Sequence, residues 1–158
     1  MAEPITYAEI AAVLRIDGAN LVWRVTRGKA RAGVRAGRMD KQGYIVLQFM
    51  GIDLQAHRVV WLLTHGEWPP GMLDHKDGRR ENNLPSNLRV CDNARNQQNS
   101  KPRGKFKGVT RLPHGRYQAQ CGKRYLGSFG TDVEAAHAYD DEAAQRYGEF
   151  ARLNFGSA

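Results

Sequence analysis

Apolar and polar positions along the first half of the chain predict short strands and two helices. The expected elements are a weakly amphipathic helix over residues 4–15, a strand over 20–26, a strand over 43–49 that turns into a hairpin reaching Leu54, and a buried helix over 56–63. Met50-Gly51 supplies the turn of that hairpin, and His65-Gly66 supplies the end of the second helix. This half of the chain therefore mixes strands with helices.

The segment from Met72 to Asn99 has its own regular order of a strand, a polar loop, a strand and a helix. Residues 72–75 and 87–90 predict the two strands, with an Asp77-Gly78 turn after the first. Asp92 is expected to be the N-cap of a helix that carries Asn96. One imidazole, one acid and several carboxamides would then converge on one short segment.

The last third of the chain predicts three short strands followed by one long helix. The strands are expected over residues 108–111, 116–121 and 123–129, and the helix is expected over 132–147. Thr131 and Glu134 form a capping-box pattern at the start of the helix. The helix is rich in alanine, so it can lie close to the apolar face of a sheet. The whole pattern predicts an α+β protein whose second part is a three-stranded antiparallel sheet packed on one helix.

Charge and composition divide the chain and indicate its partner. We expect a first domain at 1–100, with a core at about 72–99, a basic linker at 101–106, and a second domain at 107–158. The 24 Lys and Arg residues against 16 acids give a formal charge of +8 and a pI of about 9.8, which favours a polyanion as partner. From Lys101 to Arg124 there are eight basic residues and no acid. One face of the second domain should therefore be cationic.

Other features of the sequence narrow the class of protein. Two cysteines, Cys91 and Cys121, cannot form a disulfide framework or a four-cysteine cage, so no structural zinc is expected and a reducing compartment is favoured. No apolar run reaches about 18 residues, and the start of the chain lacks the order of a signal peptide. We therefore expect a cytoplasmic protein with no membrane contact and no obligate protein partner.

Polar residues of the segment 72–99 carry a resemblance to a nuclease family. Asp74-His75, Asp77-Gly78, Asn82-Asn83, Asn87-Leu88-Arg89 and Asn96 stand in one ordered series. At these residues the chain resembles the HNH endonucleases, the ββα-metal nucleases of phages and mobile introns. Each residue alone suits a plain turn or polar loop, in which Asn and Asp commonly cap the backbone. The ordered series favours the nuclease interpretation.

The resemblance implies a role for each of these residues. His75 is the expected general base, since a neutral imidazole can accept a proton from water near neutral pH. Asp74 and Asn96 would bind Mg²⁺ or Mn²⁺ through oxygen atoms. Asn87 would brace the loop or orient His75, and Asn83 is a candidate for support of the site. The signature reads His-Asn-Asn here, because position 96 is Asn.

Two further features of the first domain have a structural and a functional interpretation each. The sequence Ala-His-Arg-Val-Val-Trp at 56–61 is characteristic of the same nucleases, so His57 could support the site or be a satisfied structural histidine. Residues 27–38 are rich in glycine and arginine. They could form a solvated loop or a segment that orders on the DNA backbone.

The second domain carries a resemblance to another family. Residues 108–120, 125–140 and the closing Ala-Arg-Leu-Asn-Phe resemble the plant Apetala/ethylene-response-factor DNA-binding domain over roughly 107–155. In that family the sheet lies in the major groove of DNA, and the matching outward positions here are Arg111, Arg116, Gln118, Gln120, Lys123 and Tyr125. Arg and Gln can read guanine and adenine by paired hydrogen bonds. Thr110, Leu112, His114 and Tyr125 depart from the plant pattern, so the plant target sequence does not transfer.

Together the two resemblances imply a metal-dependent endonuclease of the homing type that cuts double-stranded DNA, from a bacterial or phage source. Phosphate contacts are expected from Arg79, Arg80 or Arg89. With a single site, a monomer would nick one strand. The alternatives are a sequence-specific DNA-binding regulator that does not cleave and a structural RNA-binding protein.

Overall fold

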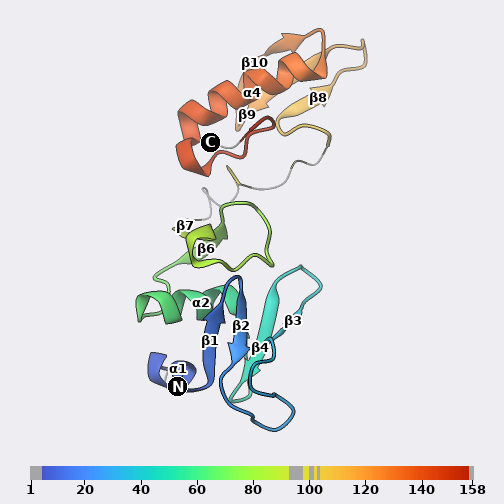
Figure 1. Ribbon diagram of the computed structural model, residues 1–158. Helices are drawn as coiled ribbons and strands as arrows, with labels where there is room; N and C mark the ends of the chain where they lie inside the picture. Colours follow the sequence, from blue (N-terminus) through green and yellow to red (C-terminus); the bar gives the residue numbers. More distant parts are fainter. Residues whose placement is uncertain (1–4, 93–97, 100–101, 103, 157–158) are drawn as a thin grey trace. The chain divides into compact units, whose positions relative to one another are not determined.

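The computed structural model describes residues 5–92, 98–99, 102 and 104–156 of the chain (Figure 1). The chain divides into two compact units, Met1–Cys91 and Asp92–Ala158, and each is described by itself. Helices and small antiparallel sheets occur in both units, which confirms the α+β prediction. Within the described residues, no helix has the length and apolar character needed to cross a membrane.

The first unit opens with a short helix and a hairpin. Helix α1 (Tyr7–Val13) begins with a capping box between Thr6 and Glu9. The chain then enters β1 (Leu14–Asp17), which pairs antiparallel with β2 (Asn20–Trp23). The expected helix over 4–15 was therefore too long at its end, and β1 was not anticipated. Leu14 is apolar in either structure, and its pairing with Trp23 decides in favour of the strand.

A second small sheet precedes the longest helix of this unit. The strands β3 (Arg38–Met39), β4 (Ile45–Phe49) and β5 (Ile52–Gln55) pair in that order, all antiparallel. Met50 and Gly51 both have positive φ in the β4–β5 turn, as the hairpin prediction required. Helix α2 (Ala56–His65) follows directly and ends at Gly66, whose φ of 81° is left-handed. The predicted helix and its end are confirmed.

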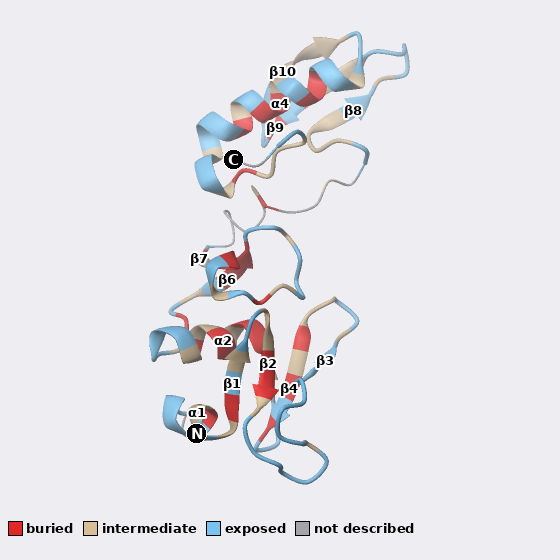
Figure 2. Cartoon of the chain, viewed as in Figure 1, coloured by how far each residue is buried: buried red, intermediate tan, exposed pale blue. Residues whose placement is uncertain are grey.

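The core of the first unit lies between α2 and the strands before it. Its fully buried members include Ile10 of α1, Leu14 of β1, and Val59, Val60 and Leu62 of α2 (Figure 2). Leu88, which begins strand β7 (Leu88–Cys91), belongs to the same apolar cluster. This contact anchors the segment that carries the polar series to the rest of the unit.

The polar series itself lies on two paired strands. Strand β6 (Met72–His75) pairs antiparallel with β7, so that Asp74 lies opposite Arg89 and His75 opposite Leu88. A 3-10 turn, η1 (Pro85–Asn87), precedes β7. Asn87, expected as the first residue of the strand, is the last residue of this turn. The helix expected after Asp92, with Asn96, falls on residues 93–97 and lies outside the described residues.

The second unit is a three-stranded sheet covered by a helix, as predicted. Strands β8 (Val109–Arg111), β9 (Tyr117–Cys121) and β10 (Arg124–Phe129) are antiparallel, with β9 central. Helix α4 (Asp132–Tyr147) has the predicted capping box of Thr131 and Glu134 and is followed by the 3-10 turn η2 (Gly148–Phe150). The buried residues of α4 form one side of the helix (Figure 2).

Close packing joins the helix to the sheet. Ala119 and Cys121 of β9 and Ala135, Ala136 and Ala143 of α4 are completely buried. A Cβ atom at Gly108, where φ is +74°, would lie 2.0 Å from the ring of Tyr139. Small residues at these positions let α4 lie against the sheet, as its alanine content predicted. The helix covers one face of the sheet, and the opposite face can contact other molecules.

Candidate active site

His75 is the last residue of β6 and is almost fully buried, with 4% of its surface exposed. Its Nε2 atom lies 3.1 Å from Oδ1 of Asn83, which is also buried. An amide oxygen only accepts hydrogen bonds, so Nε2 must carry the proton that it donates. In the neutral ring the basic lone pair is then on Nδ1. Asn83 therefore fixes the tautomer of the predicted general base.

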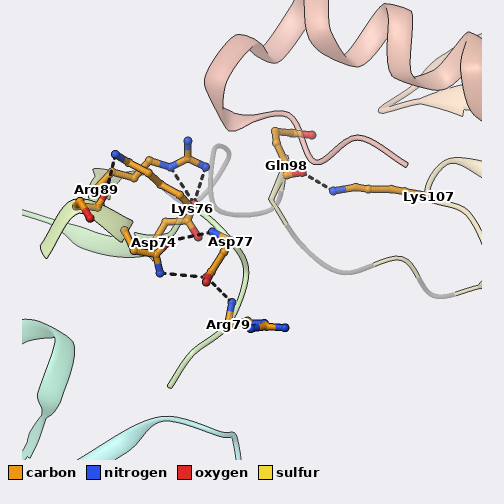
Figure 3. Close-up of polar contacts among 9 residues, drawn as sticks. Asp74, Lys76, Asp77, Arg79, Arg89, Gln98 and Lys107 are labelled. Carbon is orange, nitrogen blue, oxygen red and sulfur yellow. Dashed lines mark hydrogen bonds and ion pairs between the residues drawn. The ribbon is translucent and has the colours of Figure 1, made fainter. Parts of the chain in front are cut away.

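Asp74, the residue before His75, forms a nearly buried ion pair with Arg89 (Figure 3). Arg89 Nη2 donates to Asp74 Oδ2 at 2.8 Å, and Arg89 Nε donates to the same oxygen at 3.1 Å. The antiparallel register explains the pair, since directly opposite residues point to the same side of the sheet. Arg89, expected as a phosphate contact, thus neutralises a carboxylate of the same site.

Neighbouring residues of a strand point to opposite faces, so Asp74 and His75 can share a site only where the strand ends. Strand β6 does end at His75, whose carbonyl accepts a hydrogen bond from the Gly78 amide at 2.8 Å. Gly78 has a φ of 67°, a conformation that favours glycine. The Asp77-Gly78 turn therefore occurs where the sequence predicted it.

Asn87 holds the loop between β6 and β7 through hydrogen bonds at both ends of its amide. Its Nδ2 donates to Asp77 Oδ1 at 3.0 Å and to the Asn82 carbonyl at 2.8 Å, and its Oδ1 accepts from the Asp77 amide at 3.1 Å. The geometry agrees with the bracing role expected for Asn87, while Asn83 contacts His75.

Asp77 is the acceptor at the centre of this loop. Burial favours its neutral form, but hydrogen bonds from Asn82, the Arg79 amide and Asn87 outweigh burial and lower the pKa of Asp77. The carboxylate is therefore ionised at neutral pH. The loop gains stability from this charge above the unfolded pKa of Asp77 and loses it as the pH falls through the lowered folded value.

Replacement of Asn87 by alanine should destabilise the first unit by about 1–3 kcal/mol, because it leaves polar groups of Asp77 and Asn82 without their partner. Ser86→Ala in the same turn is the matched control, since Ser86 contributes its carbonyl to Lys76 rather than its side chain. The three tryptophans, Trp23, Trp61 and Trp68, all lie in the first unit, so urea unfolding followed by tryptophan fluorescence measures the effect. Equal stability of the two variants would contradict the bracing role.

A second imidazole packs edge-on against His75. The ring of His57, from the first turn of α2, has its centroid 5.2 Å from that of His75, at an interplanar angle of 73°. Tyr44 lies beside both rings, at 5.4 Å from His57 and 6.2 Å from His75. His57 Nδ1 is buried without a hydrogen-bond partner among the described residues. His57 thus contacts the site, whereas Tyr44 was not selected from the sequence at all.

Burial, then the neighbouring His75 and Arg58, lower the pKa of His57 to about 4. The unfolded chain has an imidazole pKa of about 6.5, so between these values the unfolded state binds the extra proton. The free energy of unfolding should therefore fall by about 2 kcal/mol between pH 7 and pH 5 from this group alone. In His57→Gln most of that fall should disappear, as measured by urea unfolding at both pH values. An identical pH dependence in the variant and the wild type would contradict a neutral, buried His57.

The described residues contain no cluster of three or more His, Cys, Asp or Glu side chains that could hold a metal ion. Asp74 is the described member of the expected metal pair, and Asn96 lies outside the described residues. One carboxylate and one amide oxygen, completed by water and a substrate phosphate, suit Mg²⁺, which takes few protein ligands. The oxygen chemistry of Asp74 fits such an ion, although Arg89 shares the carboxylate.

The sheet of the second unit presents a polar face away from α4. Gln118 and Gln120 alternate with the buried Ala119 and Cys121, and Gln120 lies opposite Tyr125, which is 60% exposed. Arg116 donates to the Ser128 carbonyl at 2.6 Å and to its hydroxyl, and so lies along this face. Lys123 is exposed in the turn between β9 and β10.

Two positions at the edge of this sheet differ from expectation. Arg111 is exposed but lies opposite Tyr117, on the parity of the buried face, whereas Thr110 lies opposite Gln118 on the polar face. Strand register, which local spacing does not give, would have selected Thr110. Arg124 lies opposite Cys121, on the parity of the buried face, and reaches Glu142 of α4 at 3.0 Å.

Comparison with known proteins supports the identification of the first unit. A family model described as HNH endonuclease matches residues 54–98, which include α2, the β6–β7 hairpin and all the residues discussed above around His75 except Tyr44. An uncharacterized HNH endonuclease of Acanthamoeba polyphaga mimivirus is 31% identical over 122 residues, which are 73% of this chain and 65% of that protein. Residues 54–98 are thus similar to HNH endonucleases.

The C-terminal part is similar to plant proteins. Dehydration-responsive element-binding protein 2A of Oryza sativa subsp. indica is 45% identical over 56 residues, 32% of this chain and 20% of that protein. An ethylene-responsive transcription factor of Arabidopsis thaliana is 35% identical over 97 residues, 54% of this chain and 60% of that protein. This chain thus spans less than two thirds of the length of each of these relatives. Its residues 54–98 match the HNH endonuclease family model, and its C-terminal part is similar to the plant AP2/ERF proteins.

Proposed function

We propose that the protein is a metal-dependent endonuclease that binds double-stranded DNA through the sheet of its second unit and hydrolyses a phosphodiester bond at His75. The observation that carries the proposal is the arrangement at the end of β6. There a buried imidazole has its tautomer fixed by Asn83 and directly follows Asp74 in the chain, within the HNH match. The homing type and a bacterial or phage source remain part of this proposal.

His75 would act on a water molecule held beside the scissile phosphate. Its Nδ1 accepts a proton as the water oxygen forms a bond to phosphorus, and the bond from phosphorus to the leaving oxygen breaks in line. Asn83 holds the ring by accepting from Nε2, so the proton arrives on the nitrogen that faces away from Asn83. Asn87 and Asp77 keep the loop that carries Asn83 in place. Asn83 thus holds the base, and Asn87 and Asp77 hold the loop that carries Asn83.

Asp74 and Asn96 would hold the divalent ion, Mg²⁺ or Mn²⁺, through their oxygen atoms. When bound, the ion would neutralise charge that develops on the phosphate and on the leaving oxygen. Arg89 balances the charge of Asp74 through two hydrogen bonds and would keep that carboxylate in one orientation. Asp74 is therefore positioned before the ion binds.

The second unit would select the target. Its polar sheet face places Arg116, Gln118, Gln120 and Tyr125 on one side, and Lys123 and Arg111 border it. Arg and Gln side chains can pair with base edges in the major groove. The basic segment 27–38 and the proposed linker 101–106 would add contacts to the phosphate backbone. The second domain is proposed to span residues 107–158. The simplest product of one site is a nick.

The substrate class and the metal requirement can be tested together. Supercoiled plasmid DNA and a structured RNA of similar length are incubated with the protein in Mg²⁺, in Mn²⁺ or in EDTA. The proposal predicts nicked or linear plasmid in either metal, intact plasmid in EDTA, and intact RNA throughout. Cutting in EDTA would contradict the metal requirement, and cutting of RNA in preference to DNA would contradict the substrate class.

A second candidate function is a DNA-binding regulator that does not cleave. It is favoured by the plant relatives, whose names include transcription factors, and by Arg89, which already neutralises Asp74. A gel-shift titration in EDTA distinguishes it when paired with the plasmid assay. Salt-sensitive, sequence-selective binding with no product in either metal would support the regulator over the nuclease.

A further inference from the structure

Arg80 is an exposed arginine that is nevertheless held in one position. Its guanidinium carbon lies 4.7 Å from the centroid of the Tyr44 ring, and its Nη1 donates to the carbonyl of Gln42 at 2.8 Å. Arg80 belongs to the loop between β6 and β7, whereas Gln42 and Tyr44 lie between β3 and β4. The stacked guanidinium thus joins two segments that are distant in the sequence.

Tyr44 in turn places this arginine beside the candidate base. Asp40 Oδ1 accepts hydrogen bonds from the amides of Gln42 and Tyr44, at 2.8 Å and 2.9 Å, which fixes the turn that carries the ring. The ring centroid of Tyr44 is 6.2 Å from that of His75. One aromatic ring therefore lies next to both the guanidinium and the catalytic imidazole.

We propose that Arg80, held over Tyr44, binds a backbone phosphate of the cleaved strand next to the bond attacked at His75, and that Tyr44 is its positioning residue. The inference rests on the proposed function and specifies which arginine the site uses. Arg89 already donates to Asp74. The Arg79 amide donates a hydrogen bond to Asp77 Oδ1, but within the described residues no ring or carbonyl holds the Arg79 side chain.

The geometry of Arg80 suits a phosphate. Within the described residues, its guanidinium makes one hydrogen bond, through Nη1 to Gln42, so Nη2 and Nε can still donate. A guanidinium presents its donors in a planar fork that matches two phosphate oxygens, and stacking on a ring leaves that edge exposed. Because the side chain is already ordered, less conformational entropy is lost when the phosphate binds.

The test separates DNA binding from cleavage. Binding to one duplex is measured in EDTA over a series of salt concentrations, with the His75→Ala variant as the parent protein. Addition of Arg80→Ala should reduce the salt slope of log K by about 1 and weaken binding roughly tenfold at about 0.15 M salt. Arg15→Ala is the matched control, since Arg15 is an exposed arginine on β1 whose one ion pair within the described residues is a 3.9 Å contact with Asp17.

Variants of Tyr44 test the positioning role. Tyr44→Leu removes the ring and should weaken binding several-fold, whereas Tyr44→Phe keeps the aromatic face and should recover most of that loss. In otherwise wild-type protein, Arg80→Ala should raise KM for DNA about tenfold and lower kcat much less. Thermal unfolding of each variant identifies any that fails to fold. Arg80→Ala changes an exposed residue, so it still tests the phosphate contact if a Tyr44 variant does not fold.

The outcomes also distinguish this inference from the proposed function. If the wild type cuts DNA but Arg80→Ala has the slope and KM of Arg15→Ala, the phosphate contact is wrong and the nuclease stands. If no metal gives cleavage but the slope still falls with Arg80→Ala, the phosphate contact stands and the nuclease does not. Equal binding by Tyr44→Phe and Tyr44→Leu would overturn the role of Tyr44.

Discussion

Replacement of His75 by alanine is expected to lower the single-turnover rate of DNA cleavage by about 10²–10⁴, the usual contribution of a positioned general base. The variant keeps Asp74, Arg89 and the second unit, so it should bind both the metal and DNA as the wild type does. The loss should therefore appear in the rate of the bound complex. Quench-flow or manual sampling of a plasmid saturated with protein measures this rate directly.

His65→Ala is the matched control for His75→Ala. His65 ends α2 in an exposed position, where its ring stacks on Trp61 at 3.8 Å. It should cleave like the wild type. His75→Gln is a second variant to test, because glutamine fills part of the space of the imidazole and can donate a hydrogen bond to Asn83. If both His75 variants cleave like His65→Ala, His75 is not the base.

Replacement of Asp74 by asparagine is expected to reduce cleavage by at least about 10², because a metal-bound phosphate contributes several kcal/mol to the transition state. Part of the loss should be recovered by raising the Mg²⁺ concentration, since asparagine keeps an oxygen ligand but loses the charge. The variant also leaves Arg89 facing a neutral amide, which should cost about 1.5–3 kcal/mol of stability. Metal titration of the cleavage rate and urea unfolding measure the two effects.

Asp53→Asn is the control for Asp74→Asn, since Asp53 is exposed on β5 opposite Gln48. It should change neither the metal dependence nor the stability appreciably. The contrast with His75→Ala is informative, because His75→Ala should keep the wild-type metal titration midpoint while its rate falls. An unchanged midpoint in Asp74→Asn would contradict a metal-binding role for this carboxylate.

Elements with strong local signals could be predicted from the sequence. Helix α4 begins at its capping box of Thr131 and Glu134, and α2 ends at Gly66, as expected from residues adjacent in the chain. The end of α1 could not be predicted, because Leu14 suits a helix and a strand equally. Its pairing with Trp23 is a contact between separate segments, and that contact decides the conformation.

The candidate site also combines features that could be predicted from the sequence with features that could not. His75, Asn83 and Asn87 come together because they lie in and around one short loop closed by paired strands, so their order in the sequence was informative. The ion pair of Asp74 with Arg89 depends on strand register. Tyr44 depends on the packing of the earlier sheet against the loop, for which the sequence has no local signal.

The most direct test of the nuclease is an order-of-addition experiment on one sample. The wild type and His75→Ala are each bound to plasmid DNA in EDTA, binding is confirmed by gel shift, and excess Mg²⁺ is then added. Both proteins are expected to bind equally, and only the wild type is expected to produce nicked or linear DNA after Mg²⁺. Equal cleavage by the two proteins, or binding by the wild type with no cleavage after Mg²⁺, would contradict this expectation.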